Sequence, residues 1–298
     1  MPLIDSQTIA TKANLKFIRP LYLLQRLIRL PNLLIIVAAQ YLTRIFLVGP
    51  SSAWKQHLAN MDFFTLSLST VFIAAAGYVI NDYYDVKIDL INKPEKVIVG
   101  KQMRRRVAMF FHTLLNFLGI GLGAMISLKV GAINFISTYL LWLYSNKLKR
   151  KPFTGNLVIS LLTATSILVV GVYYGLNYKI WIFALFSFYI SLIREIIKDM
   201  EDRRGDMHFG CRTLPIVWGI RKTKIFLYFI LGLFVLSMFV LLLLLNNTTL
   251  TFYFILMSFP TGYFVDRLYW ADTRVAYRFL SIFCKLLMLS GLLMMIFI

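Results

Sequence analysis

Cysteine, histidine and acidic residues are all scarce in this chain of 298 residues. The two cysteines, Cys211 and Cys284, are too few for a disulfide framework and lack metal-ligand spacing. The three histidines are too scattered for a metal site or a catalytic triad. Only 13 residues are Asp or Glu, so any cluster of carboxylates in this sequence is unexpected and calls for a specific role.

Apolar residues, in contrast, are abundant. Hydrophobic residues make up 59% of the chain and charged residues 15%, a balance typical of integral membrane proteins. A membrane-spanning helix needs about 20 apolar residues. The apolar stretches predict an all-α, polytopic membrane protein with a cytoplasmic N-terminal segment, 1–29, followed by a single transmembrane domain, 30–298. Nine spans are expected, at 30–49, 63–80, 107–127, 130–145, 156–175, 180–197, 225–245, 250–265 and 279–297.

Lysine and arginine are unevenly distributed between the predicted loops. They concentrate in the N-terminal segment and in the loops after spans two, four, six and eight, whereas the alternate loops contain only Lys55, Lys129 and Lys179. By the positive-inside rule, the N-terminus and all four basic loops lie in the cytoplasm, and nine spans place the C-terminus outside. The net charge of +19 therefore reflects membrane orientation, and we expect no nucleic-acid partner.

Nine of the 13 acidic residues lie in two of these basic loops or, for Glu195, at the end of the span before one, and the spacing of the aspartates repeats. Both sets read D-x-x-D-x-x-x-D: Asp82, Asp85 and Asp89 after span two, and Asp199, Asp202 and Asp206 after span six. Positions i, i+3 and i+7 share one face of a helix. Two facing carboxylate clusters are therefore predicted if the two helices are neighbours.

The carboxylate clusters indicate a divalent cation. Clustered carboxylates repel one another unless a cation joins them, and hard oxygen ligands suit Mg²⁺ better than Zn²⁺. Solvated charge at a helix end explains one such set, but it does not explain the same spacing twice. The position at the membrane boundary favours an amphipathic ligand, with a diphosphate head in the cytoplasmic mouth and a hydrocarbon tail between the spans.

Five segments, in order, resemble motifs of the UbiA superfamily of intramembrane prenyltransferases. NDYYDVKIDLINKP and KDMEDRRGD resemble its two aspartate-rich motifs. The others are RLIRLPN, similar to the first-span signature, YSNKLKRKPFTGN, similar to the Tyr and Lys motif after span four, and TLPIVWG, similar to the segment after the second aspartate motif. The resemblance implies nine transmembrane helices around a central cavity, so that 30–298 forms one prenyltransferase domain. One departure is that Val97 and Val99 stand where many relatives have prolines.

The resemblance also implies roles for individual residues. Four aspartates are expected to be catalytic by holding Mg²⁺: Asp82, Asp85, Asp199 and Asp202. Asp89 and Asp206 are expected as further or water-mediated metal ligands. The candidates for binding the diphosphate or an acceptor are Arg29, Asn32, Asn81, Tyr144, Lys147, Lys149 and Lys198.

Within the superfamily, YSNKLK and REIIKDMED are most similar to enzymes that transfer a geranylgeranyl group from its diphosphate to geranylgeranylglyceryl phosphate, which forms an ether lipid. Transfer to an aromatic acceptor of quinone, tocopherol or chlorophyll-type biosynthesis is the alternative. A divalent-cation transporter, from another functional class, would place its acids near the bilayer midplane rather than at one boundary. The expected setting is a bacterial or archaeal cell membrane, with membrane lipids around the protein and no obligate protein partner.

Overall fold

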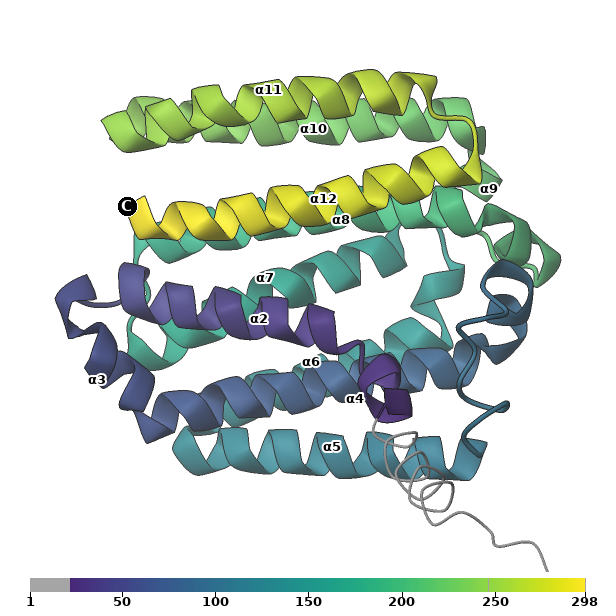
Figure 1. The fold of residues 1–298 in the computed structure, drawn as a ribbon, viewed down its shortest axis with the longest axis horizontal. Helices are drawn as coiled ribbons and strands as arrows, with labels where there is room; N and C mark the ends of the chain where they lie inside the picture. Colours follow the sequence, from purple (N-terminus) through teal and green to yellow (C-terminus); the bar gives the residue numbers. More distant parts are fainter. Residues whose placement is uncertain (1–21, 246, 298) are drawn as a thin grey trace, which may run out of the picture.

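The fold is a bundle of long helices that run side by side (Figure 1). The computed structural model describes residues 22–245 and 247–297, so residues 1–21 of the predicted N-terminal segment lie outside the described part. In chain order the elements are α2 (Leu30–Leu42), η1 (Thr43–Leu47), η2 (Ser51–Ala53), α3 (Trp54–Ala59), α4 (Met61–Asn92), α5 (Arg105–Ile126), α6 (Leu128–Asn146), η3 (Leu148–Arg150), α7 (Thr154–Tyr174), α8 (Tyr178–His208), α9 (Leu214–Val217), α10 (Gly219–Leu245), α11 (Thr248–Trp270), α12 (Arg274–Met294) and η4 (Met295–Phe297).

The all-α class and the membrane location are confirmed. Seven helices in the described residues are long and apolar enough to cross a membrane: α2 with η1, α4, α5, α7, α8, α10 and α12. The other two predicted spans, 130–145 and 250–265, lie in α6 and α11, which run beside the rest of the bundle in Figure 1. The protein is an integral membrane protein, and the count of nine membrane spans stays a prediction.

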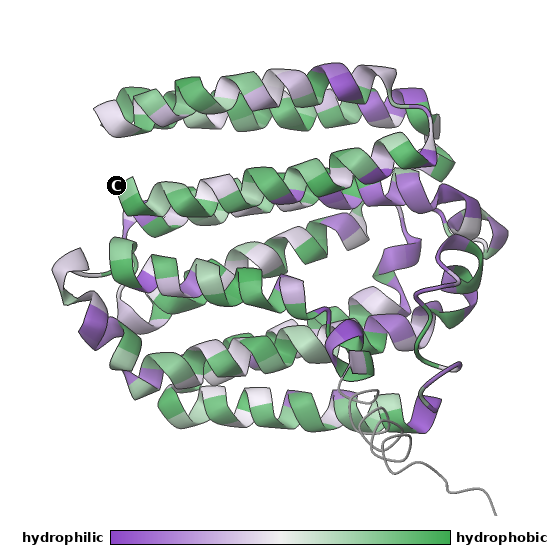
Figure 2. Ribbon diagram, viewed as in Figure 1, coloured by the Kyte–Doolittle hydropathy of each residue, from purple (hydrophilic) through white to green (hydrophobic). Residues whose placement is uncertain are grey.

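Two helices continue well beyond the spans predicted for them. The predicted spans 63–80 and 180–197 correspond to Met61–Asn92 and Tyr178–His208. Both helices end where the sequence supplies a breaker, because Pro94 disfavours helical backbone at the residue before it and Gly210 adopts a left-handed conformation with φ 69°. All six aspartates of the two motifs therefore stand on continuous helices, in the polar end of the bundle shown in Figure 2.

At the opposite end of the bundle, polar side chains cap the N-termini of four helices. Asn60, Asn177 and Asn247 each accept a hydrogen bond from a backbone N–H of the first turn of α4, α8 and α11, at 2.8, 3.0 and 3.1 Å. Ser127 caps α6 in the same way. These acceptors satisfy backbone donors that a helix leaves unpaired at its start.

Helix α8 is the central element of the fold. It packs against α4, α7, α10 and α12, and 61% of its most apolar stretch is buried inside the protein. One hydrophobic core cluster joins α8 to the C-terminal helices through buried side chains such as Ile193, Leu227 and Phe264. A second cluster joins α8 to α2 and α7. The second aspartate motif is therefore carried by the best-packed helix of the molecule.

Candidate active site

The two aspartate motifs lie at adjacent ends of α4 and α8. The side chain of Asn92, the last residue of α4, donates a hydrogen bond from Nδ2 to the carbonyl oxygen of Asp202 at 3.0 Å and accepts one at Oδ1 from the backbone N–H of Gly205 at 3.0 Å. Position 205 requires glycine, because a Cβ there would lie 2.5 Å from Nδ2 of Asn92. The two motif-bearing helices are therefore neighbours, which is the condition for facing carboxylate clusters.

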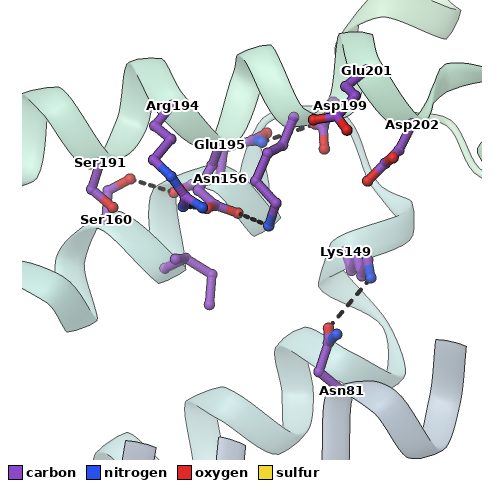
Figure 3. A network of polar contacts seen from close by, with 12 residues as sticks. Asn81, Lys149, Asn156, Ser160, Ser191, Arg194, Glu195, Asp199, Glu201 and Asp202 are labelled. Carbon is purple, nitrogen blue, oxygen red and sulfur yellow. Dashed lines mark hydrogen bonds and ion pairs between the residues drawn. The ribbon is translucent and has the colours of Figure 1, made fainter. Parts of the chain in front are cut away.

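Each carboxylate in the first half of the α4 motif has a basic or amide partner. Arg29 Nη2 lies 2.8 Å from Asp82 Oδ1. Asn81 donates from Nδ2 to Asp85 Oδ2 at 2.8 Å. The ammonium group of Lys149 pairs with the same oxygen of Asp85 and donates to Asn81 Oδ1 at 3.3 Å (Figure 3). The buried Asp85 carboxylate is thus held from two sides.

Arg29 reaches Asp82 from an unusual backbone conformation. It stands at the start of α2 with φ 53° and ψ 54°, the left-handed region, which costs a non-glycine residue about 1–2 kcal/mol. Its guanidinium lies 4.9 Å from the ring centroid of Tyr78, so one side chain contacts both a carboxylate and an aromatic face. Burial acts to lower the pKa of Arg29, but the attraction of Asp82 opposes it and the pKa is raised overall.

The α8 motif has its own polar partners. Asn156 of α7 donates from Nδ2 to Asp199 Oδ2 at 2.8 Å, and Lys93 lies 2.6 Å from Asp202 Oδ2. The other oxygen of that carboxylate, Asp202 Oδ1, is buried and has no hydrogen-bond partner. Asp206 is buried at 5% exposure. This motif therefore keeps acceptor capacity that the protein itself does not use.

Lys149 lies between the two motifs and interacts electrostatically with carboxylates of both, namely Asp85 and Asp89 on α4 and Asp206 on α8. Burial acts to lower the pKa of Lys149, but the carboxylates outweigh it and raise the pKa well above its ordinary value. The short η3 helix that carries Lys149 packs closely on α7, because a Cβ at Gly155 would lie 3.0 Å from the Cα of Lys149 and 3.2 Å from Tyr144. Tyr144 thus lies beside Lys149.

The described residues contain no group of three Asp, Glu, His or Cys side chains that could together hold a metal ion. Three of the six predicted ligands are instead each paired with a basic side chain, from Arg29, Lys93 or Lys149. The donor set nevertheless fits Mg²⁺, because it consists of carboxylate and amide oxygens and includes the buried, unpaired Asp202 Oδ1. The assignment of the six aspartates as metal ligands stays a prediction.

The remaining predicted binding residues lie in different parts of this region. Asn32 accepts a hydrogen bond from Lys285 Nζ at 2.9 Å, and Lys198 lies 3.4 Å from Glu195. Asp89 is half-buried near Asp85 and Lys149. Lys147 is exposed at the end of α6 and is not part of the network.

Sequence reasoning missed six residues that the structure places in the network: Asn92, Lys93, Asn156, Arg194, Glu195 and Lys285. All six carried a signal. Asn92 and Lys93 lie in NDYYDVKIDLINKP, Asn156 closes YSNKLKRKPFTGN, and Arg194 and Glu195 open REIIKDMED. Lys285 is a lone charge inside the predicted span 279–297, where an ionisable residue points to function by default. Their contacts are recognisable only through the packing of helices distant in sequence.

A small cavity of about 40 Å³ lies deeper in the bundle, between α2, α7, α8 and α12. Its walls are mostly apolar and include Ile35, Ile167, Phe183, Phe186 and Leu292. A cavity of this kind suits a hydrocarbon chain better than a polar ligand. The molecule thus combines a charged mouth at one end of the bundle with an apolar chamber between the helices.

The UbiA prenyltransferase family model matches residues 44–288. Digeranylgeranylglyceryl phosphate synthase from Thermococcus gammatolerans is 38% identical over 148 residues, which cover 50% of this chain and 54% of that protein. The synthase of the same name from Methanospirillum hungatei is 37% identical over 165 residues, which cover 54% of this chain and 59% of that protein. The chain therefore spans somewhat more than half the length of these curated relatives.

Solved structures cover more of the chain. A structure described as digeranylgeranylglyceryl phosphate synthase in membranes is 28% identical, with a TM-score of 0.68 over 93% of this chain and 97% of that one. A UbiA homolog from Archaeoglobus fulgidus, bound to DMAPP and Mg²⁺, is 16% identical, with a TM-score of 0.64 over 91% of this chain and 98% of that one, which shows a shared fold. The matched family model extends over most of the sequence, and the chain belongs to the UbiA prenyltransferase family.

Proposed function

We propose that this protein catalyses the Mg²⁺-dependent transfer of a prenyl group from a prenyl diphosphate to a membrane-embedded acceptor. The proposed donor is geranylgeranyl diphosphate, the proposed acceptor is geranylgeranylglyceryl phosphate, and the product is an ether lipid. The observation that carries the proposal is the pairing of two aspartate motifs across α4 and α8, with an apolar cavity deeper in the same bundle.

The metal would be held at the mouth by Asp82, Asp85, Asp199 and Asp202. When bound, Mg²⁺ neutralises the diphosphate and makes it a better leaving group. Asn81 positions Asp85 through the hydrogen bond between their side chains. Arg29, Lys93 and Lys149 neutralise the motif carboxylates and are close enough to the mouth to bind phosphate oxygens, Arg29 as a planar fork and the lysines as point charges.

The apolar cavity accounts for the second half of the reaction. The acceptor hydroxyl attacks C1 of the prenyl donor, the C1–O bond to diphosphate breaks, and the hydroxyl proton is released. Positive charge develops on the allylic carbon as that bond lengthens. Phe183 and Phe186 line the cavity and present aromatic faces, and a dry chamber keeps water from capturing the cation.

The choice of acceptor rests on charge and on similarity. A glycerol phosphate ether brings a dianionic phosphate, so it needs additional cationic groups near the mouth. The chain has such groups in Lys147, Lys149, Arg150, Lys198, Arg203 and Arg204. The relatives from Thermococcus gammatolerans and Methanospirillum hungatei are named for the synthesis of digeranylgeranylglyceryl phosphate.

We further propose that the mouth faces the cytoplasm, with the N-terminus inside and the C-terminus outside. The segments 81–106, 146–153 and 198–224 contain 18 of the 32 lysines and arginines, and they gather at the end of the bundle where the aspartates lie (Figures 1 and 2). The positive-inside rule assigns that end to the cytoplasm.

The test uses purified protein in lipid nanodiscs with geranylgeranyl diphosphate and Mg²⁺. Geranylgeranylglyceryl phosphate and an aromatic acceptor, a naphthoate or homogentisate, are offered together, and the products are identified by mass. The expected product is the diether phosphate, formed with release of diphosphate and abolished by EDTA. Prenylation of the aromatic compound alone would overturn the lipid acceptor, and activity that survives EDTA would overturn the role of Mg²⁺.

A further inference from the structure

A second cluster of charged side chains lies deeper in the bundle than the aspartates. On α8, Arg194 Nη1 lies 2.6 Å from Glu195 Oε1, and Lys198 Nζ lies 3.4 Å from Glu195 Oε2. Lys285 of α12 donates a hydrogen bond to Asn32 of α2 at 2.9 Å. Lys285 also interacts electrostatically with Arg194, Lys198 and Glu195. These residues come from α2, α8 and α12 and lie together. We call Asn32, Arg194, Glu195, Lys198 and Lys285 the polar layer.

This layer carries an unbalanced positive charge. Arg194, Lys198 and Lys285 interact with Glu195, and they are bordered by Arg29, which is paired with Asp82, and by Asp199. Four cations thus face three carboxylates. Glu195 is only 6% exposed. The Nε of Arg194 is buried and has no hydrogen-bond partner. Because cations between apolar helices are costly unless they are paired, this surplus of cations and the unpaired Arg194 Nε indicate an anionic ligand.

The layer adjoins the aspartate mouth, because Glu195 and Lys198 interact electrostatically with Asp199. Glu195 precedes Asp199 by one helical turn on α8, so the cluster lies on the membrane side of the second motif. Figure 3 shows Arg194 and Glu195 beside Asn156 and Ser160 of α7, on the far side of Asn156 from Asp202. A diphosphate bound through Mg²⁺ requires the carboxylates of the mouth, whereas the single carboxylate of this layer is already paired with two cations.

The layer also borders the apolar cavity. Ile35 and Ile36 follow Asn32 by one turn of α2, and Met288 follows Lys285 by one turn of α12. All three of these apolar residues line the cavity. An anionic group bound by Lys285 would therefore sit at the rim of a chamber that accepts hydrocarbon.

We propose that Arg194, Lys198 and Lys285 form a binding subsite for the phosphate monoester of the lipid acceptor. The proposal rests on the proposed prenyl transfer and names the site of its second substrate. A phosphate monoester carries about two negative charges at neutral pH, so it would pair with the cations that Glu195 alone does not balance. Its hydrocarbon tail extends into the apolar cavity, and its glycerol hydroxyl faces the mouth where the donor C1 lies.

The test compares two acceptors that differ only in the phosphate, geranylgeranylglyceryl phosphate and geranylgeranylglycerol. Two quantities are measured for each variant. The first readout is the dissociation constant of each acceptor, titrated without donor into purified protein in nanodiscs. The second is KM for acceptor and for donor. Lys285→Met and Arg194→Gln should each weaken binding of the phosphate acceptor by about tenfold or more, because a charge-assisted hydrogen bond is lost. Binding of geranylgeranylglycerol and KM for the donor should stay within about twofold of wild type.

Two variants serve as controls. Lys285→Arg keeps the charge and should restore most of the affinity for the phosphate acceptor. Arg278→Met removes a cation from an exposed position on the same helix and should leave both acceptors unaffected. Thermal unfolding in the same nanodiscs identifies any variant that fails to fold, in which case Lys285→Gln and Arg194→Ala, which also remove the charge, carry the comparison.

The outcomes separate the subsite from the proposed function. If Lys285→Met weakens both acceptors equally, or raises KM for the donor instead, the phosphate subsite is wrong while prenyl transfer stands. If wild type binds both acceptors equally, the subsite is also wrong. If the variants lose only the phosphate acceptor but no donor and acceptor pair gives product, the subsite stands and the proposed reaction fails.

Discussion

Asn92, at the end of α4, holds Gly205 on α8 through a hydrogen bond of 3.0 Å from the glycine N–H, and no side chain fits between them. The same amide donates to the carbonyl of Asp202. Arg274 of α12 donates to the backbone carbonyl of Asn92, which ties a third helix to the contact. The distance between the two aspartate motifs is therefore determined by a contact that contains no carboxylate side chain.

We predict that Gly205→Ala destabilises the protein and lowers activity. The new Cβ would lie 2.5 Å from Asn92 Nδ2 and 2.6 Å from Oδ1, so the helices must separate or the amide must leave its hydrogen bonds. Overpacking of this kind costs about 1–3 kcal/mol. Thermal unfolding measures the loss, with Gly232→Ala as the matched control, since a Cβ at that position on α10 meets nothing within 4 Å. Equal stability of the two variants would contradict the assigned role of Gly205.

We predict that Asp82→Ala, Asp85→Ala, Asp199→Ala and Asp202→Ala each lower kcat by about 100-fold or more, because each removes a ligand from the step that assists the leaving group. Diphosphate release from labelled donor measures the rate, and circular dichroism checks that the variants fold. Asp266→Ala, at an exposed position on α11, is the control and should keep its activity. Near wild-type rates in the four motif variants would rule out the Mg²⁺ site.

We predict that Lys149→Met makes the stability of the protein more dependent on Mg²⁺. Without the lysine, the buried Asp85 loses its cationic partner, which lowers the free energy of unfolding by about 2 kcal/mol. The loss is smaller than for a fully buried pair because the Lys149 side chain is 24% exposed. Added Mg²⁺ should restore most of that loss, so its stabilising effect in thermal unfolding should be larger than in wild type. Lys151→Met, an exposed lysine nearby, is the control. Equal stabilisation of Lys149→Met and wild type by Mg²⁺ would count against the proposal that Lys149 and Mg²⁺ bind the same carboxylate.

We predict that the loop 209–213, after α8, lies in the cytoplasm and that the loop 175–177, between α7 and α8, lies outside. Fusions of a reporter enzyme that is active only outside the cytoplasm, made after residue 176 and after residue 212, should give high and low activity respectively. The reverse pattern would place the aspartates at the outer surface and would invert the proposed orientation.

The sequence carries enough information to predict the helices and the shared face of each aspartate set. Apolar runs mark the helices because a membrane span must be apolar. The apolar runs end at the membrane boundary, so hydropathy alone underestimates the lengths of α4 and α8 by about three turns each. The repeated spacing of Asp82, Asp85 and Asp89 survives this error, because a continuous helix is what places positions i, i+3 and i+7 on one face.

The partners of the carboxylates could not be predicted in the same way. Lys149 and Asp85 are 64 positions apart, and Lys93 and Asp202 are 109 apart. Such pairs depend on how helices pack, which leaves no periodic signal in one sequence. Lysines in a cytoplasmic loop are also expected for topology alone, so nothing in the composition separates Lys149, in the network, from the exposed Lys147.

The ion pairs of Arg29, Lys93 and Lys149 have a consequence for the order and strength of binding. Each of these cations contacts a carboxylate that we propose as a metal ligand, so a metal that binds there alone would compete with them. A diphosphate offers the displaced cations new partners, which makes metal binding easier in its presence. By thermodynamic reciprocity the metal must strengthen diphosphate binding by the same factor, so that the two ligands bind cooperatively.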